Sequence, residues 1–259
     1  MGQLYDRIGT GYDVTRRADP EIVHRIALHL RAHTGDPVID VACGTGNYTV
    51  ELAKMGLTMT GADISLEMLR KAQSKREDIS WVRAEADSLP FGDGLFLGAT
   101  CILAIHHFND LETSFREIYR VLKQGRLVIF TAAPEQMKNY WLNAYFPQAM
   151  QVSCNQMPTV NKLMTTLQAA GFDIVGTESF LIEPDLQDFF LYSGKHDPKM
   201  YLDSFVRRGI STFANKATPG EIEDGCERLR HDIMKGNISK VIQKYISLLG
   251  DYLFVVADK

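Results

Sequence analysis

Hydrophobic and polar positions change along the chain in blocks that have the period of either a strand or a helix. The short apolar run Val38–Val41 predicts a strand buried on both faces of a parallel sheet, followed by a helix that ends near Met55. Upstream, Asp19 and Pro20 stand in the positions of an N-cap and a first helical residue. An amphipathic helix is therefore expected to begin there.

The same alternation continues to about residue 183, and it predicts an α/β fold with a doubly wound, mostly parallel, Rossmann-like sheet. Further strands are expected at 57–63, 79–87, 95–108, 126–132 and 173–183. Helices are expected between them at 65–75, 110–122 and 159–172.

A helical pattern covers 184–250, and the apolar segment 251–259 then predicts one last strand. Thr218 and Glu221 have the spacing of a capping box at the start of one of these helices. Because a final strand follows the helical excursion, we interpret the excursion as an insertion. The expected organisation is a sheet domain made of 1–183 and 251–259, closed by an antiparallel strand, with an inserted helical cap at 184–250 over its active edge.

The turn after Val41 contains two glycines, Gly44 and Gly46, which would let bare backbone approach a nucleotide. A dinucleotide-binding turn has the pattern G-x-G-x-x-G, and Thr49 stands where the third glycine should be, which disfavours NAD. Asp63 ends the second expected strand, where a carboxylate can bind both ribose hydroxyls of any adenosine ligand. The turn alone therefore leaves NAD and other adenosine ligands open.

Five motifs stand in a fixed order at the strand ends and on the helices that follow. They are VIDVACGTGNYT, GADISLEML, AEADSLPFGDGLF, ILAIHHFND and REIYRVLKQGRLVI. This ordered set, from about Tyr5 to Phe130, resembles the class I S-adenosylmethionine-dependent methyltransferases, and within them the branch similar to quinone-biosynthesis C-methyltransferases. The N-terminal stretch YDRIGTGYD also resembles the start of that branch. The resemblance implies S-adenosylmethionine as the cofactor.

Three positions depart from the family pattern. Ala42 replaces the usual first glycine of the turn, Arg126 ends a KQGR segment where the family has KPGG, and Leu97 replaces a usual aspartate. None of the three changes a residue to which the resemblance gives an adenosine contact.

The resemblance places cofactor contacts at the ends of several strands. It implies that Asp63 binds the ribose diol, that Asp87 faces the adenine amino group and that Tyr12 closes over the methionine end. Asp40 would orient the turn or the methionine ammonium group. The implied cofactor-binding residues are Tyr12, Asp40, Ala42, Gly44, Gly46, Asp63, Ile64, Ala86, Asp87, Ser88 and Leu103.

His106 and His107 are the candidates for chemistry at the transferred methyl group. Both are expected on the fourth strand, where successive side chains point to opposite sides, so only one should face the methyl group. The resemblance favours His106. We interpret it as a positioning residue, and the alternative is a general base.

Composition and net charge argue against several classes of partner and location. The chain has 259 residues and a net charge of −4, so a generally basic nucleic-acid binder is not expected. It shows neither a signal-peptide pattern nor an apolar run of the roughly 20 residues that a membrane span needs. Its four widely spaced cysteines indicate reduced thiols and a cytoplasmic location. No metal site is expected, and Cys154 and Cys226 would bind a soft metalloid acceptor only if the fold brought them together.

The expected function is the transfer of a methyl group from S-adenosylmethionine to a small-molecule acceptor by in-line displacement, with neither a nucleic acid nor a membrane as partner. The main alternative is a non-catalytic module that binds S-adenosylmethionine as a sensor. An NAD-dependent oxidoreductase is less favoured. The acceptor, the atom that is methylated and the oligomeric state stay open.

Overall fold

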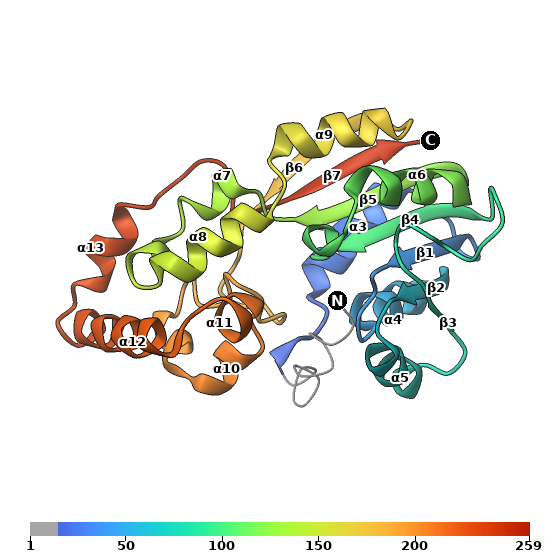
Figure 1. Ribbon diagram of the computed structural model, residues 1–259. Helices are drawn as coiled ribbons and strands as arrows, with labels where there is room; N and C mark the ends of the chain where they lie inside the picture. The colour runs from blue at the N-terminus through green and yellow to red at the C-terminus, as the bar shows by residue number, and fades with distance from the viewer. Residues whose placement is uncertain (1–14) are drawn as a thin grey trace.

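The computed structural model describes residues 15–259, which form a seven-stranded sheet flanked by helices (Figure 1). The strand order is β3-β2-β1-β4-β5-β7-β6, and β7 is antiparallel to both of its neighbours. The predicted α/β fold, mostly parallel with a final antiparallel strand, is confirmed. The strands are β1 (Pro37–Val41), β2 (Thr58–Asp63), β3 (Ser80–Arg83), β4 (Phe96–Ile102), β5 (Leu122–Thr131), β6 (Asp173–Phe180) and β7 (Tyr252–Asp258).

The helices that precede β1 or connect the strands cover both faces of the sheet. They are α3 (Pro20–Leu30), α4 (Asn47–Lys54), α5 (Leu66–Lys75), α6 (Leu111–Val121) and α9 (Val160–Ala169). α3 and α4 pack together on one face, whereas α6 and α9 pack together on the other. The side chains of Asp19 and Ser65 accept hydrogen bonds from first-turn N–H groups of α3 and α5, so the N-cap predicted at Asp19 is confirmed.

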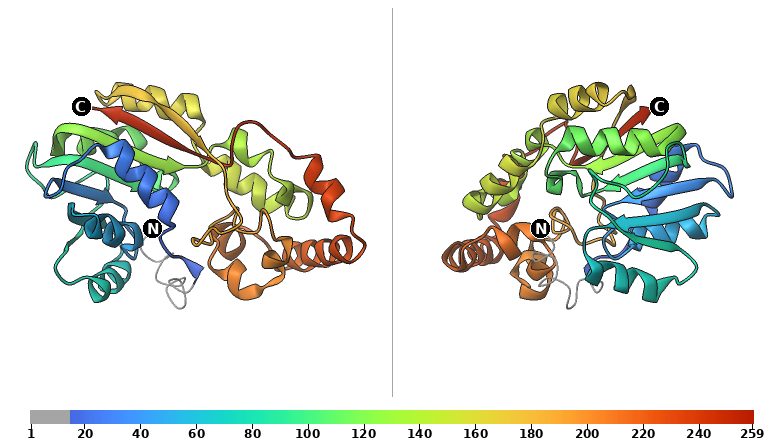
Figure 2. Two further views of the ribbon diagram at one scale, coloured as in Figure 1. Left: turned by 180° about the vertical axis from the view of Figure 1, so that it is seen from behind. Right: turned by 45° about the vertical axis from the view of Figure 1, so that its right-hand side comes forward.

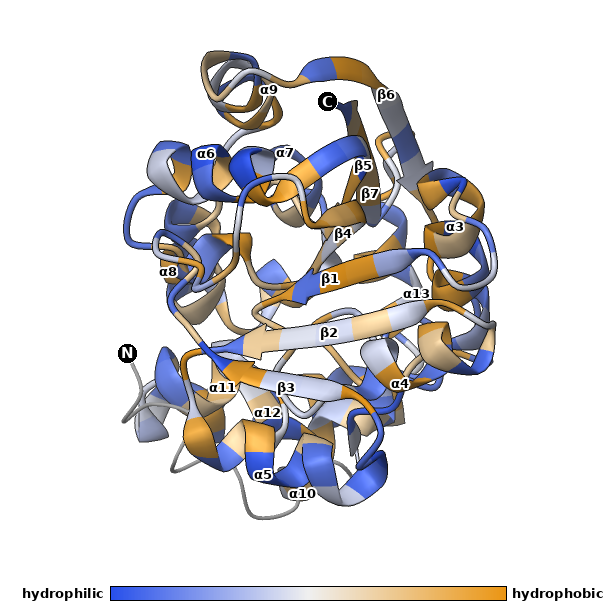
Figure 3. Ribbon diagram, turned by 90° about the vertical axis from the view of Figure 1, so that its right-hand side faces the viewer, coloured by the Kyte–Doolittle hydropathy of each residue, from blue (hydrophilic) through white to orange (hydrophobic). Residues whose placement is uncertain are grey.

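Side chains of the central strands alternate between two apolar cores. On β5, Val128 and Phe130 belong to the core on the α3 side, whereas Leu127 and Ile129 belong to the core on the α6 side. A strand that is buried on both faces needs apolar residues at nearly every position, which explains the short apolar runs in the sequence. Figure 3 shows β1 as a largely apolar strand in the middle of the sheet.

A second group of helices gathers at the end of the sheet where β5 ends (Figures 1 and 2). We call it the helical lobe, and it comprises residues 134–157 and 184–250. Its helices are α7 (Pro134–Met137), η2 (Trp141–Ala144), α8 (Pro147–Gln156), η3 (Pro198–Leu202), α10 (Ser204–Arg208), α11 (Ser211–Asn215), α12 (Pro219–Met234) and α13 (Ile238–Gln243). None of the helices in residues 15–259 has both the length and the apolar composition that crossing a lipid bilayer requires.

The two segments of the helical lobe share one apolar core. The rings of Phe146 and Phe213 meet edge to face with their centroids 4.9 Å apart, and the hydroxyl groups of Tyr140 and Tyr201 are hydrogen bonded to each other. The sequence-based boundaries assigned residues 134–157 to the sheet domain and did not anticipate this packing. The division into a sheet domain and an inserted cap remains a prediction.

Glu221 also joins the two segments. The hydroxyl group of Thr218 accepts a hydrogen bond from the Glu221 N–H, as the capping box predicts. The Glu221 carboxylate, however, accepts hydrogen bonds from the N–H groups of Gln148 and Ala149 at the start of α8. The predicted capping box is therefore only half formed, because the carboxylate caps a neighbouring helix.

Two strands end earlier than the sequence predicted. β3 ends at Arg83, because Glu85 and Ser88 pair with each other in a turn. β4 ends at Ile102, because Leu103 adopts a left-handed conformation with φ of +54° that cannot continue a strand. A short 3₁₀ helix, η1 (Ile105–His107), follows. Placing 84–87 and 103–108 on strands was therefore wrong.

Candidate functional site

A cavity lies at the carboxyl ends of the parallel strands and extends beneath the helical lobe. Its sheet side is formed by the turns that follow β1, β2, β3 and β4, and includes Gly44 and Asp63. Its lobe side includes Met157, Ile210 and Lys216. Ligands of doubly wound sheets bind at this edge, so the cavity occupies the position expected for a ligand site.

The turn after β1 brings bare backbone to the cavity at Gly44. This residue has φ of +56°, lines the cavity, and has open space where a β-carbon would stand. Ala42 also lines the cavity and holds φ of +58°, a conformation that costs a residue with a β-carbon about 1–2 kcal/mol. Both residues therefore line the cavity, and the cofactor contacts expected of them remain predictions.

Gly46 packs against the ring of Trp81 on β3, and the cofactor contact that the family resemblance implies for it remains a prediction. It is not among the residues that line the cavity. Its φ is +72°, and a β-carbon there would stand 2.4 Å from the ring of Trp81. The close approach of this indole, together with the left-handed backbone, explains the glycine.

Asp63 connects the ends of β1 and β2. Its Oδ2 accepts a hydrogen bond from the N–H of Gly44 at 2.8 Å, and its Oδ1 accepts one from the N–H of Ser65 at 2.8 Å. The carboxylate lines the cavity, and burial raises its pKa while the backbone hydrogen bonds oppose that rise. Each carboxylate oxygen has further lone pairs, so the group can also accept hydrogen bonds from a ligand.

Asp40 is not among the residues that line the cavity. Its buried carboxylate accepts a hydrogen bond from the hydroxyl group of Thr49 on α4 at 2.6 Å. It accepts another from the hydroxyl group of Thr100 on β4 at 2.8 Å. Burial raises the pKa of Asp40 to about 6. Of the two roles implied for it, this geometry favours orienting the turn over binding a ligand ammonium group.

The turn after β3 contributes another wall. Ala86 and Asp87 line the cavity, as does Ile64 after β2. Ser88 is not among the lining residues; it is exposed, and its N–H bonds to the carbonyl of Glu85. The arrangement places an apolar surface beside a carboxylate, which suits an adenine ring with its amino group.

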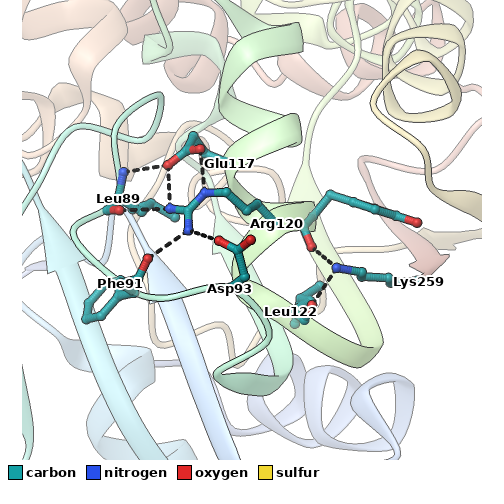
Figure 4. Close-up of polar contacts among 8 residues, drawn as sticks. Leu89, Phe91, Asp93, Glu117, Arg120, Leu122 and Lys259 are labelled. Atoms are coloured by element: carbon teal, nitrogen blue, oxygen red, sulfur yellow. Dashed lines mark hydrogen bonds and ion pairs between the residues drawn. The ribbon is translucent and has the colours of Figure 1, made fainter.

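Arg120 of α6 holds the chain that follows this turn (Figure 4). Its guanidinium donates to the carbonyls of Leu89 at 3.0 Å and Phe91 at 2.8 Å, and to the carboxylate of Asp93 at 2.7 Å. It also pairs with Glu117, whose carboxylate accepts a hydrogen bond from the Leu89 N–H at 3.0 Å. Arg120 is the second arginine of the motif REIYRVL, and the sequence alone did not reveal this role.

His106 and His107 both line the cavity, with their ring centroids 3.9 Å apart. The strand placement behind the argument that only one of them faces the methyl group was wrong, because the pair lies on the 3₁₀ helix η1. Burial lowers the pKa of His106 well below its usual value and lowers that of His107 to about 4, and the charge of Lys216 lowers both further. Both imidazoles are therefore neutral near pH 7.

Asp188 belongs to the helical lobe and contacts residues that precede α3 or lie on α4. It is buried, pairs with the guanidinium of Arg16, and accepts a hydrogen bond from the Tyr48 hydroxyl at 3.1 Å. The side-chain amide of Asn47 donates to the Arg16 carbonyl at 2.7 Å. Sequence reasoning missed this group because Arg16 and Asp188 are 172 residues apart and belong to no motif.

Of the remaining residues that the sequence singled out, only some line the cavity. Leu103 lines the cavity, whereas Tyr12 lies outside the described residues. Cys154 and Cys226 are buried free thiols, and neither is among the lining residues. Within residues 15–259, no cluster of three or more histidine, cysteine, aspartate or glutamate side chains could hold a metal ion.

Comparison with known proteins identifies relatives of this chain. A family model described as a methyltransferase domain matches residues 39–130. The chain is 33% identical over 130 residues to a demethylmenaquinone methyltransferase of Corynebacterium kroppenstedtii, covering 48% of this chain and 56% of that protein. It is 31% identical over 163 residues to an uncharacterised methyltransferase of Synechocystis, covering 60% and 76%. The match thus spans only a little over half the length of the first of these relatives.

A solved structure extends the similarity to nearly the whole chain. It is a candidate methyltransferase from an antibiotic biosynthesis pathway of Anabaena variabilis, 30% identical, with a TM-score of 0.85. The match covers 93% of this chain and 98% of that one. The sheet order, the turn at Gly44 and these relatives agree with the resemblance seen in the sequence motifs, and the chain belongs to the class I S-adenosylmethionine-dependent methyltransferases.

Proposed function

We propose that this protein is an enzyme that transfers the methyl group of S-adenosylmethionine to a small-molecule acceptor bound beneath the helical lobe. The observation that carries the proposal is the continuity of one cavity from Gly44 and Asp63 on the sheet side to Ile210 and Lys216 on the lobe side. Two reactants that share one cavity can be aligned, and alignment is the main requirement of a displacement reaction.

The sheet side of the cavity fits the cofactor. Gly44 offers bare backbone, Asp63 offers a carboxylate to the ribose hydroxyls, and Asp87 with Ile64 offers an acceptor beside an apolar wall for adenine. None of these contacts needs a phosphate group on the ligand. This agrees with S-adenosylmethionine, the cofactor of the family, which has no phosphate. When bound, S-adenosylmethionine supplies a methyl group on a positively charged sulfur that leaves as a neutral thioether.

The lobe side fits an acceptor. Met137, Met157, Phe190 and Leu191 make its wall largely apolar, which excludes water from the reacting atoms. The acceptor atom forms a bond to the methyl carbon while the carbon–sulfur bond breaks, and the electron pair of that bond stays on sulfur. The protein then needs to hold the two reactants in line, and neutral His106 in the wall can hold the acceptor through a hydrogen bond.

A cofactor sensor is the alternative. The extended lobe side of the cavity favours an enzyme, because a sensor has no need of a second chamber beside the cofactor. The relatives named demethylmenaquinone methyltransferase further support a small-molecule acceptor.

The test measures methyl transfer from labelled S-adenosylmethionine to a panel of small molecules. Met157→Trp, which fills the lobe side, should abolish transfer and leave S-adenosylhomocysteine affinity within a few-fold of the parent. Asp63→Ala should weaken S-adenosylhomocysteine binding. A protein that binds S-adenosylhomocysteine but methylates no member of a broad panel would support the sensor instead.

A further inference from the structure

Lys216 is a cation in the cavity wall, and the part of the chain that the structure describes gives it no anionic partner. It follows α11, lines the lobe side of the cavity and is half-buried. Among residues 15–259, no hydrogen bond or ion pair engages its ammonium group. Burial lowers its pKa, which reflects the cost of holding this charge in the wall without a counter-ion. An anion bound in the cavity would remove that cost.

The carboxylates of the cavity wall do not provide this anion. Asp188 is engaged by Arg16 and Tyr48, and Asp63 is engaged by two backbone N–H groups. Glu85 and Asp87 follow β3, which β2 and β1 separate from β4 in the sheet. Lys216 instead acts electrostatically on the two histidines that follow β4. The positive charge therefore lies on the β4 side of the cavity, whereas Glu85 and Asp87 lie on its β3 side.

A second unsatisfied polar group lies in the same wall. Nδ1 of His106 is buried and has no hydrogen-bond partner among residues 15–259. His106 and Lys216 both line the cavity and are close enough for the lysine charge to disfavour protonation of the imidazole. A buried polar atom without a partner costs roughly 1–3 kcal/mol, so a ligand oxygen that reached this nitrogen would be stabilised. In the tautomer protonated at Nδ1, the imidazole donates a hydrogen bond to an oxygen.

We propose that the methyl acceptor is a mainly apolar small molecule with one anionic oxygen, a carboxylate or an ionised hydroxyl group, that pairs with Lys216 and accepts a hydrogen bond from His106. The inference rests on the proposed function, since it names the chemistry of the acceptor. The apolar walls at Met157 and Ile210 receive the body of the molecule, while the paired groups fix one end of it.

The experiment measures the affinity of three probes in the presence of saturating S-adenosylhomocysteine. The probes are 2-naphthoate, 2-naphthol and neutral 2-naphthamide, which share one apolar body. The variants are Lys216→Met, which removes the charge, and Lys216→Arg, which keeps it. Lys235→Met is the matched control, because Lys235 is also a helix C-cap residue but is exposed and away from the cavity.

The parent should bind at least one anionic probe about tenfold more tightly than 2-naphthamide, and Lys216→Met should remove that preference with 2-naphthamide affinity unchanged. Lys216→Arg should retain the preference, and Lys235→Met should match the parent. Preference for 2-naphthoate identifies a carboxylate; binding of 2-naphthol with the absorption of its ionised form identifies a hydroxyl group.

The inference would be overturned if the anionic probes did not bind, if they bound no more tightly than 2-naphthamide, or if Lys216→Met did not change their affinity. Methyl transfer to neutral acceptors under those conditions would leave the proposed function standing. The converse result, anion binding through Lys216 without methyl transfer to any acceptor, would support the anion site and contradict the enzyme.

Discussion

The backbone N–H of Gly44 donates a hydrogen bond to Oδ2 of Asp63 at 2.8 Å, which joins the turn after β1 to the end of β2. The carboxylate thus holds the cofactor-side turn and also lines the cavity. A substitution at Asp63 should therefore change both the shape of the turn and any contact with a ligand.

The first prediction concerns this carboxylate. Asp63→Ala should weaken S-adenosylhomocysteine binding, because each lost charge-assisted hydrogen bond costs ~1.5–3 kcal/mol. Asp63→Asn keeps one acceptor oxygen and should fall between the parent and the alanine variant. Calorimetric titration gives the affinities, and circular dichroism confirms that each variant is folded. Equal affinity of a folded Asp63→Ala variant and the parent would remove Asp63 from the cofactor site.

The second prediction separates the two glycines of the turn. Gly46→Ala should destabilise the fold, because its β-carbon would stand 2.4 Å from the Trp81 ring and its φ is +72°. Gly44→Ala places a methyl group in open cavity space, so it should pay only the backbone strain of about 1–2 kcal/mol while obstructing the cofactor. Urea unfolding and S-adenosylhomocysteine titration measure the two effects.

The contrast between the two variants is the decisive result. Gly46→Ala should lower the free energy of unfolding more than Gly44→Ala does. Relative to that loss of stability, Gly44→Ala should weaken S-adenosylhomocysteine binding more than Gly46→Ala does. If both variants bound S-adenosylhomocysteine like the parent, the proposed contact between the cofactor and the bare backbone at Gly44 would be wrong.

The third prediction concerns the support of the turn that carries Asp87. Arg120→Met removes donors to two backbone carbonyls and to two carboxylates, and should lower the free energy of unfolding by about 1–3 kcal/mol. It should also weaken S-adenosylhomocysteine binding, because the chain after Asp87 loses its anchor. Arg116→Met is the control on the same helix, since Arg116 is exposed and pairs with Glu112 alone among the ion pairs of the described residues.

Arg116→Met should leave stability within about 0.5 kcal/mol of the parent, as is usual for an exposed ion pair. If Arg120→Met were as mild as Arg116→Met in both urea unfolding and ligand titration, the network in Figure 4 would have no role in shaping the site.

The sequence predicted the sheet and many of the residues that line the cavity at its edge, because both depend on local patterns. Apolar runs, N-caps and glycine turns lie within a few residues of each other, so Asp19, Gly44 and Asp63 could be recognised along the chain. The same reasoning placed His106 and His107 on a strand, because nothing local revealed that Leu103 would adopt a positive φ. Backbone strain of this kind is imposed by the surrounding fold.

The lobe side of the cavity could not be predicted from local patterns. Ile210 and Lys216 flank the short helix α11, whose position is defined only by distant partners, and Asp188 meets Arg16 across most of the chain. Gly46 shows a second limit: its place in a motif implied a ligand contact, but the motif did not reveal that the residue packs against Trp81. A motif gives the position of a residue, but its contacts decide its role.

The fourth prediction concerns the role of His106 in the reaction. Burial and the charge of Lys216 keep its pKa well below the usual histidine value, so it is neutral across the range in which a free histidine titrates. The rate of methyl transfer should therefore show no histidine limb between about pH 6 and 8. His106→Asn should lower the rate by less than about a hundredfold, because asparagine retains a hydrogen-bond donor and an acceptor. A fall above about a thousandfold, with unchanged S-adenosylhomocysteine affinity and loss of a histidine limb, would instead identify a general base.

The last prediction follows the pH dependence of stability through His107. Burial lowers its pKa in the folded protein to about 4, whereas the ordinary pKa of a histidine, as in the unfolded chain, is 6.5. The unfolded chain therefore binds the proton first as the pH falls, so the stability that neutral His107 gives is present above about pH 6.5 and is lost towards pH 4.

Between pH 7 and pH 4 the parent should accordingly lose about 1–3 kcal/mol more stability in urea unfolding than His107→Gln, which cannot take up this proton. The buried carboxylate of Asp40, whose pKa is raised to about 6, changes stability in the opposite direction, but it is present in both proteins and cancels in the difference. His24→Gln, on the exposed face of α3, is the control and should follow the parent. If His107→Gln lost stability on acidification as steeply as the parent, the imidazole would not be held neutral in the cavity wall, and Lys216 would lack the uncharged neighbours that leave its charge available to a ligand.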